Sequence, residues 1–324
     1  MGVKTKIRRA ANADVNTVSG AFEEFYQEKQ AKNLAAPTLK NYRQSVEMFM
    51  KFHDMDESTS LEQVNVNQFY EWINTLKLDG VKPSSINHYL RDCRTFFYWC
   101  MDADRAYIEK PFKIQLIEGQ EEQLKLFSEE ELDLLLVKPR KNDSFAEWRT
   151  WAIVNWVLAT GNRASTIVEV KLEDVNFRKK EISLRHTKNK KAQVIPLSSS
   201  LETVLKEYVR VWRQGTEEDG WLFPSIGDEQ LTTNALRCAF TQYCTRRGVS
   251  RHNIHGLRHN FAKGWIQNNG NMFALQKILG HSSLDMTRRY VKLFSEDIKE
   301  DYDRFSPLDS MKRKSKRTQV VKRS

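Results

Sequence analysis

The spacing of apolar residues is the feature that most restricts the fold of this chain. In four stretches before residue 105, large apolar side chains recur three or four positions apart, which would place them on one face of an α-helix. Pro37 and Pro83 stand where helices could begin, and Asn65 or Asn67 could cap another. Four short amphipathic helices are expected to pack as a compact bundle. The stripes are Phe22, Phe25 and Tyr26; Leu39, Tyr42, Val46, Phe49 and Met50; Phe69, Trp72, Ile73 and Leu76; and Ile86, Leu90, Cys93, Phe97 and Cys100.

The period of the apolar pattern changes between residues 175 and 196. Ile182 and Leu184 alternate with polar residues, and Val194 precedes Pro196, a pattern typical of β-strands. The polar, basic residues 187–191 between them would form the tip of a β-hairpin or small antiparallel sheet. Helical stripes stand on both sides of this region. The sequence therefore predicts a mainly α fold with a small antiparallel β-sheet, in the α+β class.

Helical periodicity also fades after residue 105 and returns at Ser128, where Glu131 completes a capping box. A chain of 324 residues is long enough for two domains with cores of their own. We expect a flexible basic arm at residues 1–16, a helical domain at 17–105 and a linker at 106–125. A second domain would occupy residues 126–310, and a basic disordered tail residues 311–324.

The charge of the chain favours a polyanionic partner. Its net charge is +10, which suits nucleic acid, although a basic protein without such a partner would look the same. The chain shows no apolar run of about 18 residues and no apolar signal core near its start. The four cysteines lack metal-site spacing and are expected to be reduced thiols. These features predict a cytoplasmic protein without a membrane partner.

Basic residues off the apolar stripes of the first domain are candidates for contacts with DNA phosphates and grooves. Each of them could instead belong to an ordinary solvated face. The candidates are Lys40, Arg43, Lys82, His88, Arg91 and Arg94.

The most informative stretch for chemistry runs from residue 253 to 291. His255 and Arg258 are three residues apart, so a helix would place them on one face. Gly280 can end a helix before His281, and the next helix would carry Tyr290. This set suits a phosphodiester, because arginine binds two oxygens, histidine donates hydrogen bonds and a tyrosine oxygen can attack phosphorus.

A metal site in the same stretch is a weaker interpretation. His252, His255 and His259 have helix-like spacing, but no cysteine or carboxylate nearby completes a zinc-binding set. We therefore expect no metal site, and no other cofactor.

Taken together, these motifs resemble the tyrosine recombinase family, which includes phage integrases, Xer-type resolvases and the integrases of mobile elements. The resemblance covers nearly the whole second domain, and the helical first domain looks like the core-binding domain of the family. Several motifs that follow one another in the family's order indicate the family more specifically than any single motif does. They are Thr160-Gly161-Asn162-Arg163, Lys188, His255-Gly256-Leu257-Arg258-His259, Leu279-Gly280-His281-Ser282 and Tyr290.

The resemblance implies a role for each matching residue. Tyr290 would attack the scissile phosphate and form a 3′-phosphotyrosyl bond. Arg163 and Arg258 would hold the non-bridging oxygens, and His281 would donate a further hydrogen bond to them. Fixed donors of this kind stabilise the charge that develops in the transition state.

Two further roles follow from the resemblance. Lys188, at the hairpin tip, would protonate the leaving 5′ oxygen, although Lys190 or Lys191 could serve instead. His255 would lie beside the phosphate and help to move the tyrosine proton. Asn162 and Thr166 depart from the family pattern, because an apolar and an acidic residue are usual there. We expect these departures to alter the support of the pocket rather than its chemistry.

The function that the resemblance implies is site-specific recombination of double-stranded DNA through a Holliday junction. It implies a homotetramer on paired sites with inverted-repeat half-sites. It also allows accessory proteins as further partners. We favour the integrase of a mobile genetic element. A chromosome-dimer or plasmid-dimer resolvase of the Xer type, a type IB topoisomerase and a non-catalytic DNA-binding regulator remain alternatives.

Overall fold

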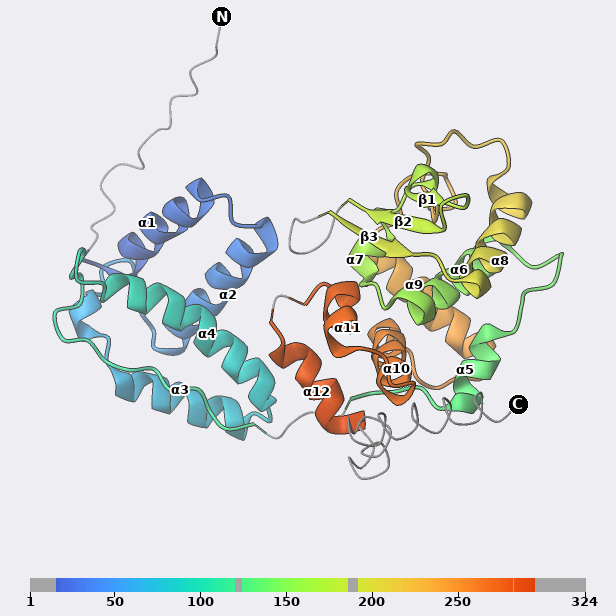
Figure 1. The fold of residues 1–324 in the computed structure, drawn as a ribbon. Helices are drawn as coiled ribbons and strands as arrows, with labels where there is room; N and C mark the ends of the chain where they lie inside the picture. Colours follow the sequence, from blue (N-terminus) through green and yellow to red (C-terminus); the bar gives the residue numbers. More distant parts are fainter. Residues whose placement is uncertain (1–15, 120–123, 186–191, 282, 295–324) are drawn as a thin grey trace, which may run out of the picture. The chain divides into compact units, whose positions relative to one another are not determined.

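The computed structural model describes residues 16–119, 124–185, 192–281 and 283–294. The chain divides into two compact units, Met1–Glu122 and Gln123–Ser324 (Figure 1). The expected arm apart from Asn16, the hairpin tip with Lys188, and the expected tail lie outside the described residues. In the part that is described, no helix is long and apolar enough to cross a membrane.

The first unit is a bundle of four α-helices, as the apolar stripes predict. Each stripe faces the interior, and Phe49 lies near its centre with its ring stacked on Phe69 at a centroid distance of 4.4 Å. At the start of α3, Asn65 and Gln68 form a capping box, which satisfies backbone N–H groups that would otherwise lack partners. The helices are α1 (Val18–Ala31), α2 (Ala36–Phe52), α3 (Val66–Leu78) and α4 (Pro83–Cys100).

Part of the expected linker, residues 106–125, instead packs into the first unit. Ile108 and Ile114 are only 5% and 1% exposed and belong to its core. The Asn87 side chain accepts a hydrogen bond from the backbone N–H of Ile117 at 2.9 Å and donates one to its carbonyl at 2.8 Å. Single apolar anchors, the Asn87 amide and the Tyr98 hydroxyl, which accepts from the backbone N–H of Ile114 at 3.1 Å, hold the segment. Such contacts leave no helical or alternating pattern in the sequence.

The second unit is built around α6 (Phe145–Thr160), which is apolar on nearly all sides. Its tryptophans Trp148, Trp151 and Trp156 are all buried, as expected for a helix with neighbours on every face. Helices α8, α9 and α10 pack against it. The other α-helices are α5 (Glu129–Leu136), α7 (Ala164–Ile167), α8 (Ser199–Tyr208), α9 (Thr233–Arg246), α10 (Ile254–Gln267), α11 (Met272–Leu279) and α12 (Asp285–Phe294).

A three-stranded antiparallel sheet lies beside α7 in the same unit (Figure 1). Its strands, in the order β1-β2-β3, are β1 (Val175–Asn176), β2 (Glu181–Leu184) and β3 (Gln193–Pro196). Ile182 pairs with Ile195, and both side chains are buried. The predicted mainly α fold with a small antiparallel sheet is therefore confirmed.

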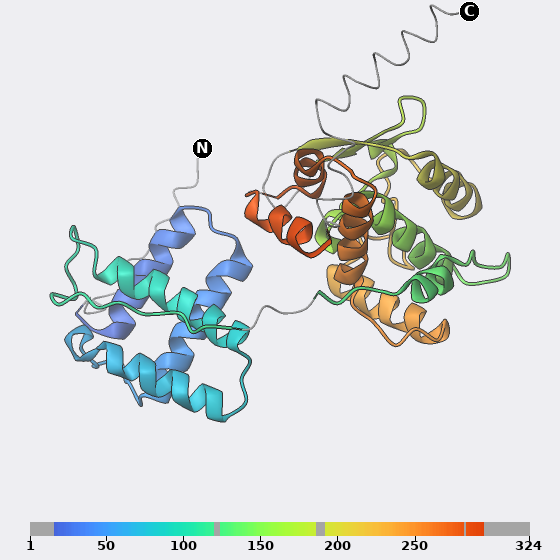
Figure 2. The same cartoon turned by 60° about the horizontal axis from the view of Figure 1, so that its bottom comes forward.

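Helices α10, α11 and α12 lie side by side at the C-terminal end of the described chain (Figure 2). Gly280 ends α11 in a left-handed conformation with φ of 60°, which a glycine adopts without steric cost. The chain then turns into α12, so the ends of α6 and α11 and the faces of α10 and α12 meet.

Truncation of Ile114 tests whether residues 106–119 belong to the first unit. We expect Ile114→Ala to destabilise the bundle by about 3 kcal/mol, because it leaves a cavity in a packed core. Leu116→Ala is the matched control, since Leu116 is 36% exposed. Hydrogen exchange of α3 and α4 peptides in the full chain measures the effect, and equal exchange in the two variants would show that the segment does not belong to the core.

Candidate active site

The end of α6 supplies the first part of the site. Gly161 caps the helix with φ of 63°, and its carbonyl accepts a hydrogen bond from Arg258 Nη1 at 2.6 Å. A Cβ on Gly161 would come within 2.5 Å of Phe261 and 2.6 Å of Leu279. Glycine therefore meets two requirements, the left-handed turn and the close approach of α10 and α11. Asn162 departs from the family pattern and is used structurally, because its Oδ1 accepts from Trp156 Nε1 at 2.9 Å.

Arg258 of α10 is the centre of the site and is 2% exposed. Besides Gly161, its Nη2 donates to the Leu279 carbonyl at 2.9 Å and to His281 Nε2 at 2.9 Å. Burial, and then the charge of Arg163, lower the pKa of Arg258 to about 10, so it remains a cation at neutral pH. Within the described residues no carboxylate forms an ion pair with this buried guanidinium.

Arg163 brings a second guanidinium to the same point. It stands at the start of α7, and its Nη1 donates to the Leu279 carbonyl at 3.3 Å. One carbonyl oxygen therefore accepts from both arginines. Burial lowers the pKa of Arg163 as well. Two like charges around one acceptor create a site that favours an anion.

The geometry around His281 determines which of its nitrogens carries the proton. Arg258 can only donate, so His281 Nε2 must accept. Nδ1 then carries the hydrogen and donates to Thr287 Oγ1 at 2.9 Å. Burial, followed by the charges of Arg258 and Arg163, lowers the pKa of His281 to about 4. His281 is therefore neutral at pH 7, with its lone pair directed at Arg258.

Tyr290 of α12 lies over this cluster and is 5% exposed. Its hydroxyl oxygen lies 2.8 Å from His259 Nδ1 and is also hydrogen-bonded to Arg258. The ring is stacked parallel to that of His281 at 6.2 Å. Burial raises the pKa of Tyr290, and this effect outweighs the opposing effect of the nearby arginines. The phenol is therefore protonated at neutral pH in this state.

His255 and His259 lie one turn apart on α10, with their rings in edge contact at 4.7 Å. The His255 ring is exposed, whereas His259 is half-buried and contacts the tyrosine hydroxyl. From the sequence alone, His259 had no expected role beyond a rejected metal site. Its position four residues after His255 was the available signal, because helical geometry places both residues on one face.

The structure therefore brings five of the six expected catalytic residues into one site, and the sixth, Lys188, lies outside the described residues. The described part of the chain contains no group of three or more histidine, cysteine, aspartate or glutamate side chains arranged to hold a metal ion. The five are Arg163, His255, Arg258, His281 and Tyr290.

The candidate DNA-contacting residues of the first unit fall into two groups. Lys40, Lys82 and Arg91 are exposed. Arg43 forms an ion pair with Glu23 at 2.9 Å, and its guanidinium lies over the Tyr26 ring at 4.3 Å. His88 lies 3.6 Å from Asp92, and Arg94 lies 5.2 Å from the Tyr98 ring centroid. The second group thus has partners within the unit, which the apolar pattern could not indicate.

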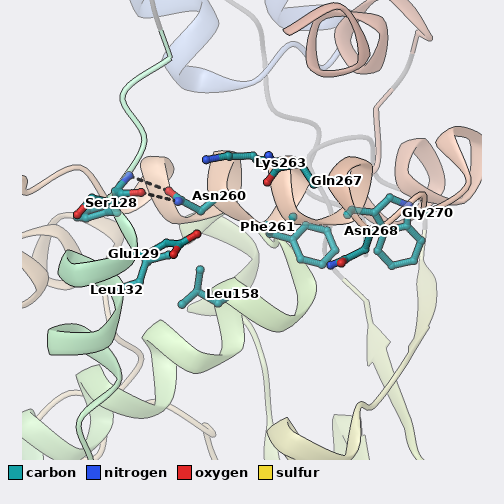
Figure 3. Close-up of a pocket in the computed structure, with 13 residues that line it drawn as sticks. Ser128, Glu129, Leu132, Leu158, Asn260, Phe261, Lys263, Gln267, Asn268 and Gly270 are labelled. Carbon is teal, nitrogen blue, oxygen red and sulfur yellow. Dashed lines mark hydrogen bonds between the residues drawn. The ribbon is translucent and has the colours of Figure 1, made fainter. Parts of the chain in front are cut away.

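A cavity of about 590 Å³ lies against another side of α10 (Figure 3). Its walls include Phe127, Glu129 and Phe261. Asn260, also in the wall, binds the backbone of Phe127 through hydrogen bonds of 2.9 and 2.8 Å. None of the five catalytic candidates lines this cavity. It is therefore separate from the cluster around Arg258.

The lowered pKa values of the site histidines predict a loss of stability in mild acid. Unfolded histidines bind a proton near pH 6.5, whereas burial lowers the pKa of His259 and His281 to about 4. Between these pH values the unfolded state binds more protons, so stability falls as the pH falls from 6.5 towards 4. We expect a loss on the order of 1 kcal/mol per histidine after allowance for solvent screening.

Calorimetric melting of the wild-type chain and of the His281→Asn variant at pH 7 and pH 5 measures this effect. The variant should lose less stability on acidification than the wild type. His252→Asn, at an exposed position, is the control and should behave as the wild type. Equal pH dependence in all three proteins would contradict a neutral, half-buried His281.

Comparison with known proteins places this arrangement in a family. The sequence profile of the phage integrase family matches residues 125–297, and that of the phage integrase N-terminal SAM-like domain matches residues 22–104. Tyrosine recombinase XerC of Staphylococcus aureus (strain bovine RF122 / ET3-1) is 25% identical over 279 residues, which cover 85% of this chain and 92% of that protein.

Solved structures share the fold. The Tn1549 transposon integrase in complex with transposon right end DNA aligns with a TM-score of 0.69 at 20% identity, over 90% of this chain and 99% of that one. The XerH site-specific recombinase bound to palindromic difH substrate aligns with a TM-score of 0.66 at 18% identity, over 87% and 83%. With the family profile covering more than half of its length, this chain belongs to the phage integrase family of tyrosine recombinases.

Proposed function

We propose that this protein is a site-specific DNA recombinase that cleaves and rejoins strands through a 3′-phosphotyrosyl intermediate. One observation carries the proposal. The buried cation Arg258 has no carboxylate partner in the described chain, shares an acceptor with Arg163 and is hydrogen-bonded to the Tyr290 hydroxyl. A nucleophilic oxygen at the centre of an anion-binding site suits attack on a phosphodiester.

The proposed cleavage step uses these groups in turn. Tyr290 Oη attacks phosphorus, the bond from phosphorus to the 5′ oxygen breaks, and the 5′ oxygen leaves with a proton from a general acid. Arg163 and Arg258 stabilise the charge on the non-bridging oxygens. Lys188 remains the candidate acid, with Lys190 and Lys191 as alternatives. The ester to the tyrosine keeps the phosphate activated, so a 5′-hydroxyl from another strand can displace the phenolate without an external energy source.

The proposed role of His281 needs a change from the state seen here. Its Nε2 accepts from Arg258, and its proton lies on Nδ1 towards Thr287. To donate to a phosphate oxygen, Nε2 must acquire a proton, either by exchange of tautomer or by protonation of the ring. A bound phosphate favours this change, because its negative charge offsets the positive charge of the two arginines, which otherwise lowers the pKa of His281.

The proposed substrate is double-stranded DNA with two inverted-repeat half-sites, paired by a homotetramer through a Holliday junction. The net charge of +10 and the exposed Lys40, Lys82 and Arg91 support phosphate contacts. The named relatives are consistent with this substrate, since they include a transposon integrase with transposon end DNA and a recombinase with its difH site. That the protein recombines the DNA of a mobile genetic element stays a prediction. Finding its recombination site at the ends of such an element would test it.

Covalent capture tests the proposed chemistry on a mixture of DNA sequences and needs no defined target site. The full-length protein is incubated with nicked duplexes of random sequence, denatured, and searched for DNA that remains attached to protein. We expect the wild type to enrich one family of duplexes. Tyr290→Phe should give only background attachment, yet bind the enriched duplex within a few fold of the wild type, since many phosphate contacts supply affinity.

Tyr70→Phe is the matched control, because it removes an exposed phenol on α3, and it should retain covalent attachment. Attachment by the Tyr290→Phe variant would overturn the assignment of the nucleophile. Cleavage and rejoining of single duplexes, without exchange between two copies of the enriched site, would favour a topoisomerase instead.

A further inference from the structure

Among the described residues, the imidazole hydrogen-bonded to the hydroxyl of Tyr290 is that of His259 rather than that of His255. His259 Nδ1 lies 2.8 Å from Tyr290 Oη, and the two rings are 5.7 Å apart. His255, expected from the resemblance to help move this proton, touches His259 through its ring edge instead. The group in position to exchange a proton with the nucleophile is therefore one that the family pattern left without a role.

We propose that His259 is a further catalytic residue, the base that takes the proton of Tyr290 during strand cleavage and returns it during rejoining. This inference rests on the proposed function of Tyr290 as nucleophile. As the Oη–P bond forms, the hydroxyl proton passes to His259 Nδ1 and the bond to the 5′ oxygen breaks. In rejoining, a 5′-hydroxyl gives its proton back to the general acid that protonated it in cleavage and attacks phosphorus. The Oη–P bond then breaks, and the phenolate regains its proton from His259.

The hydrogen-bond pattern gives this transfer its direction. Arg258 can only donate to Tyr290 Oη, and the proposal assigns the hydroxyl proton to the hydrogen bond with His259 Nδ1. Nδ1 must then hold a lone pair, and the hydrogen of the neutral ring lies on Nε2. A hydrogen bond from the attacking oxygen to a basic nitrogen is the arrangement that general-base catalysis requires.

The surrounding charges keep this base unprotonated before the reaction. On α10 it faces His255 and Arg258, and on α12 it faces Arg289 and Tyr290. Burial, and then His255, Arg258 and Arg289, lower the pKa of His259 to about 4, so the ring is unprotonated and Nδ1 can accept at neutral pH. A phosphodiester bound at Arg163 and Arg258 adds negative charge, which stabilises the imidazolium that the transfer creates.

The test is the pH dependence of covalent attachment, measured with the full-length protein on the duplex enriched by covalent capture. His259→Asn keeps an acceptor oxygen close to the position of Nδ1 but cannot hold the proton, and His259→Ala removes both properties. His252→Asn is the matched control, because His252 is an exposed histidine just before α10. Band shifts on the same duplex show that each variant folds and binds.

We expect both His259 variants to attach at least about 100-fold more slowly than the wild type at pH 7, with binding unchanged. Their rates should rise about tenfold per pH unit from pH 7 to 9, because hydroxide must then remove the phenolic proton. The wild type and His252→Asn should show rates nearly independent of pH over this range, since their base is already unprotonated.

Two results would overturn the inference in different ways. If His259→Asn attaches at the wild-type rate and only His259→Ala is slow, His259 merely positions the hydroxyl. If His259→Asn is slow but its pH dependence matches that of the wild type, the residue does not take the proton. Failure of the wild type to attach to any duplex would overturn the proposed function and this inference with it.

Discussion

A buried guanidinium that forms no ion pair with a carboxylate of the described residues is the constraint on which the site depends. An isolated buried charge costs several kcal/mol unless polar groups surround it, and here two carbonyls, an imidazole and a phenol do so. Arg258 thereby joins the end of α6, the end of α11 and the side of α12. The glycines Gly161 and Gly280 make this possible, because each turns the chain so that a carbonyl or a side chain reaches the cation.

The same charge determines the protonation of its neighbours. His281 must direct a lone pair at Arg258, and His259 faces a hydroxyl that Arg258 already binds. Both imidazoles are therefore neutral, and the phenol keeps its proton because burial outweighs the nearby cations. The site thus holds its phenol protonated and both of these imidazoles neutral at pH 7. Under the proposed function, a bound phosphate would add negative charge beside the two arginines and so favour the proton transfers that the reaction needs.

Much of this could be predicted from the sequence, because the signals are local. The bundle helices follow from apolar spacing and from caps such as Asn65, and the strands from the alternation around Ile182. The approach of Arg163, His255, Arg258, His281 and Tyr290 was expected from their motifs. The packing of residues 106–119 against the first unit could not be predicted, because single apolar anchors such as Ile114 leave no periodic signal in the sequence. The ion pair of Arg43 with Glu23 and the contact of His259 with Tyr290 were missed because they join residues far apart in sequence.

The most direct test of this account is the position of the proton on the half-buried imidazoles of His259 and His281. Long-range proton–nitrogen correlation spectra of histidine-labelled protein at pH 7, assigned with the His259→Asn and His281→Asn variants, report it. The hydrogen bonds predict opposite tautomers, with the proton on Nδ1 of His281 and on Nε2 of His259. A proton on Nε2 of His281 would contradict the account, because Arg258 could not then donate to that nitrogen.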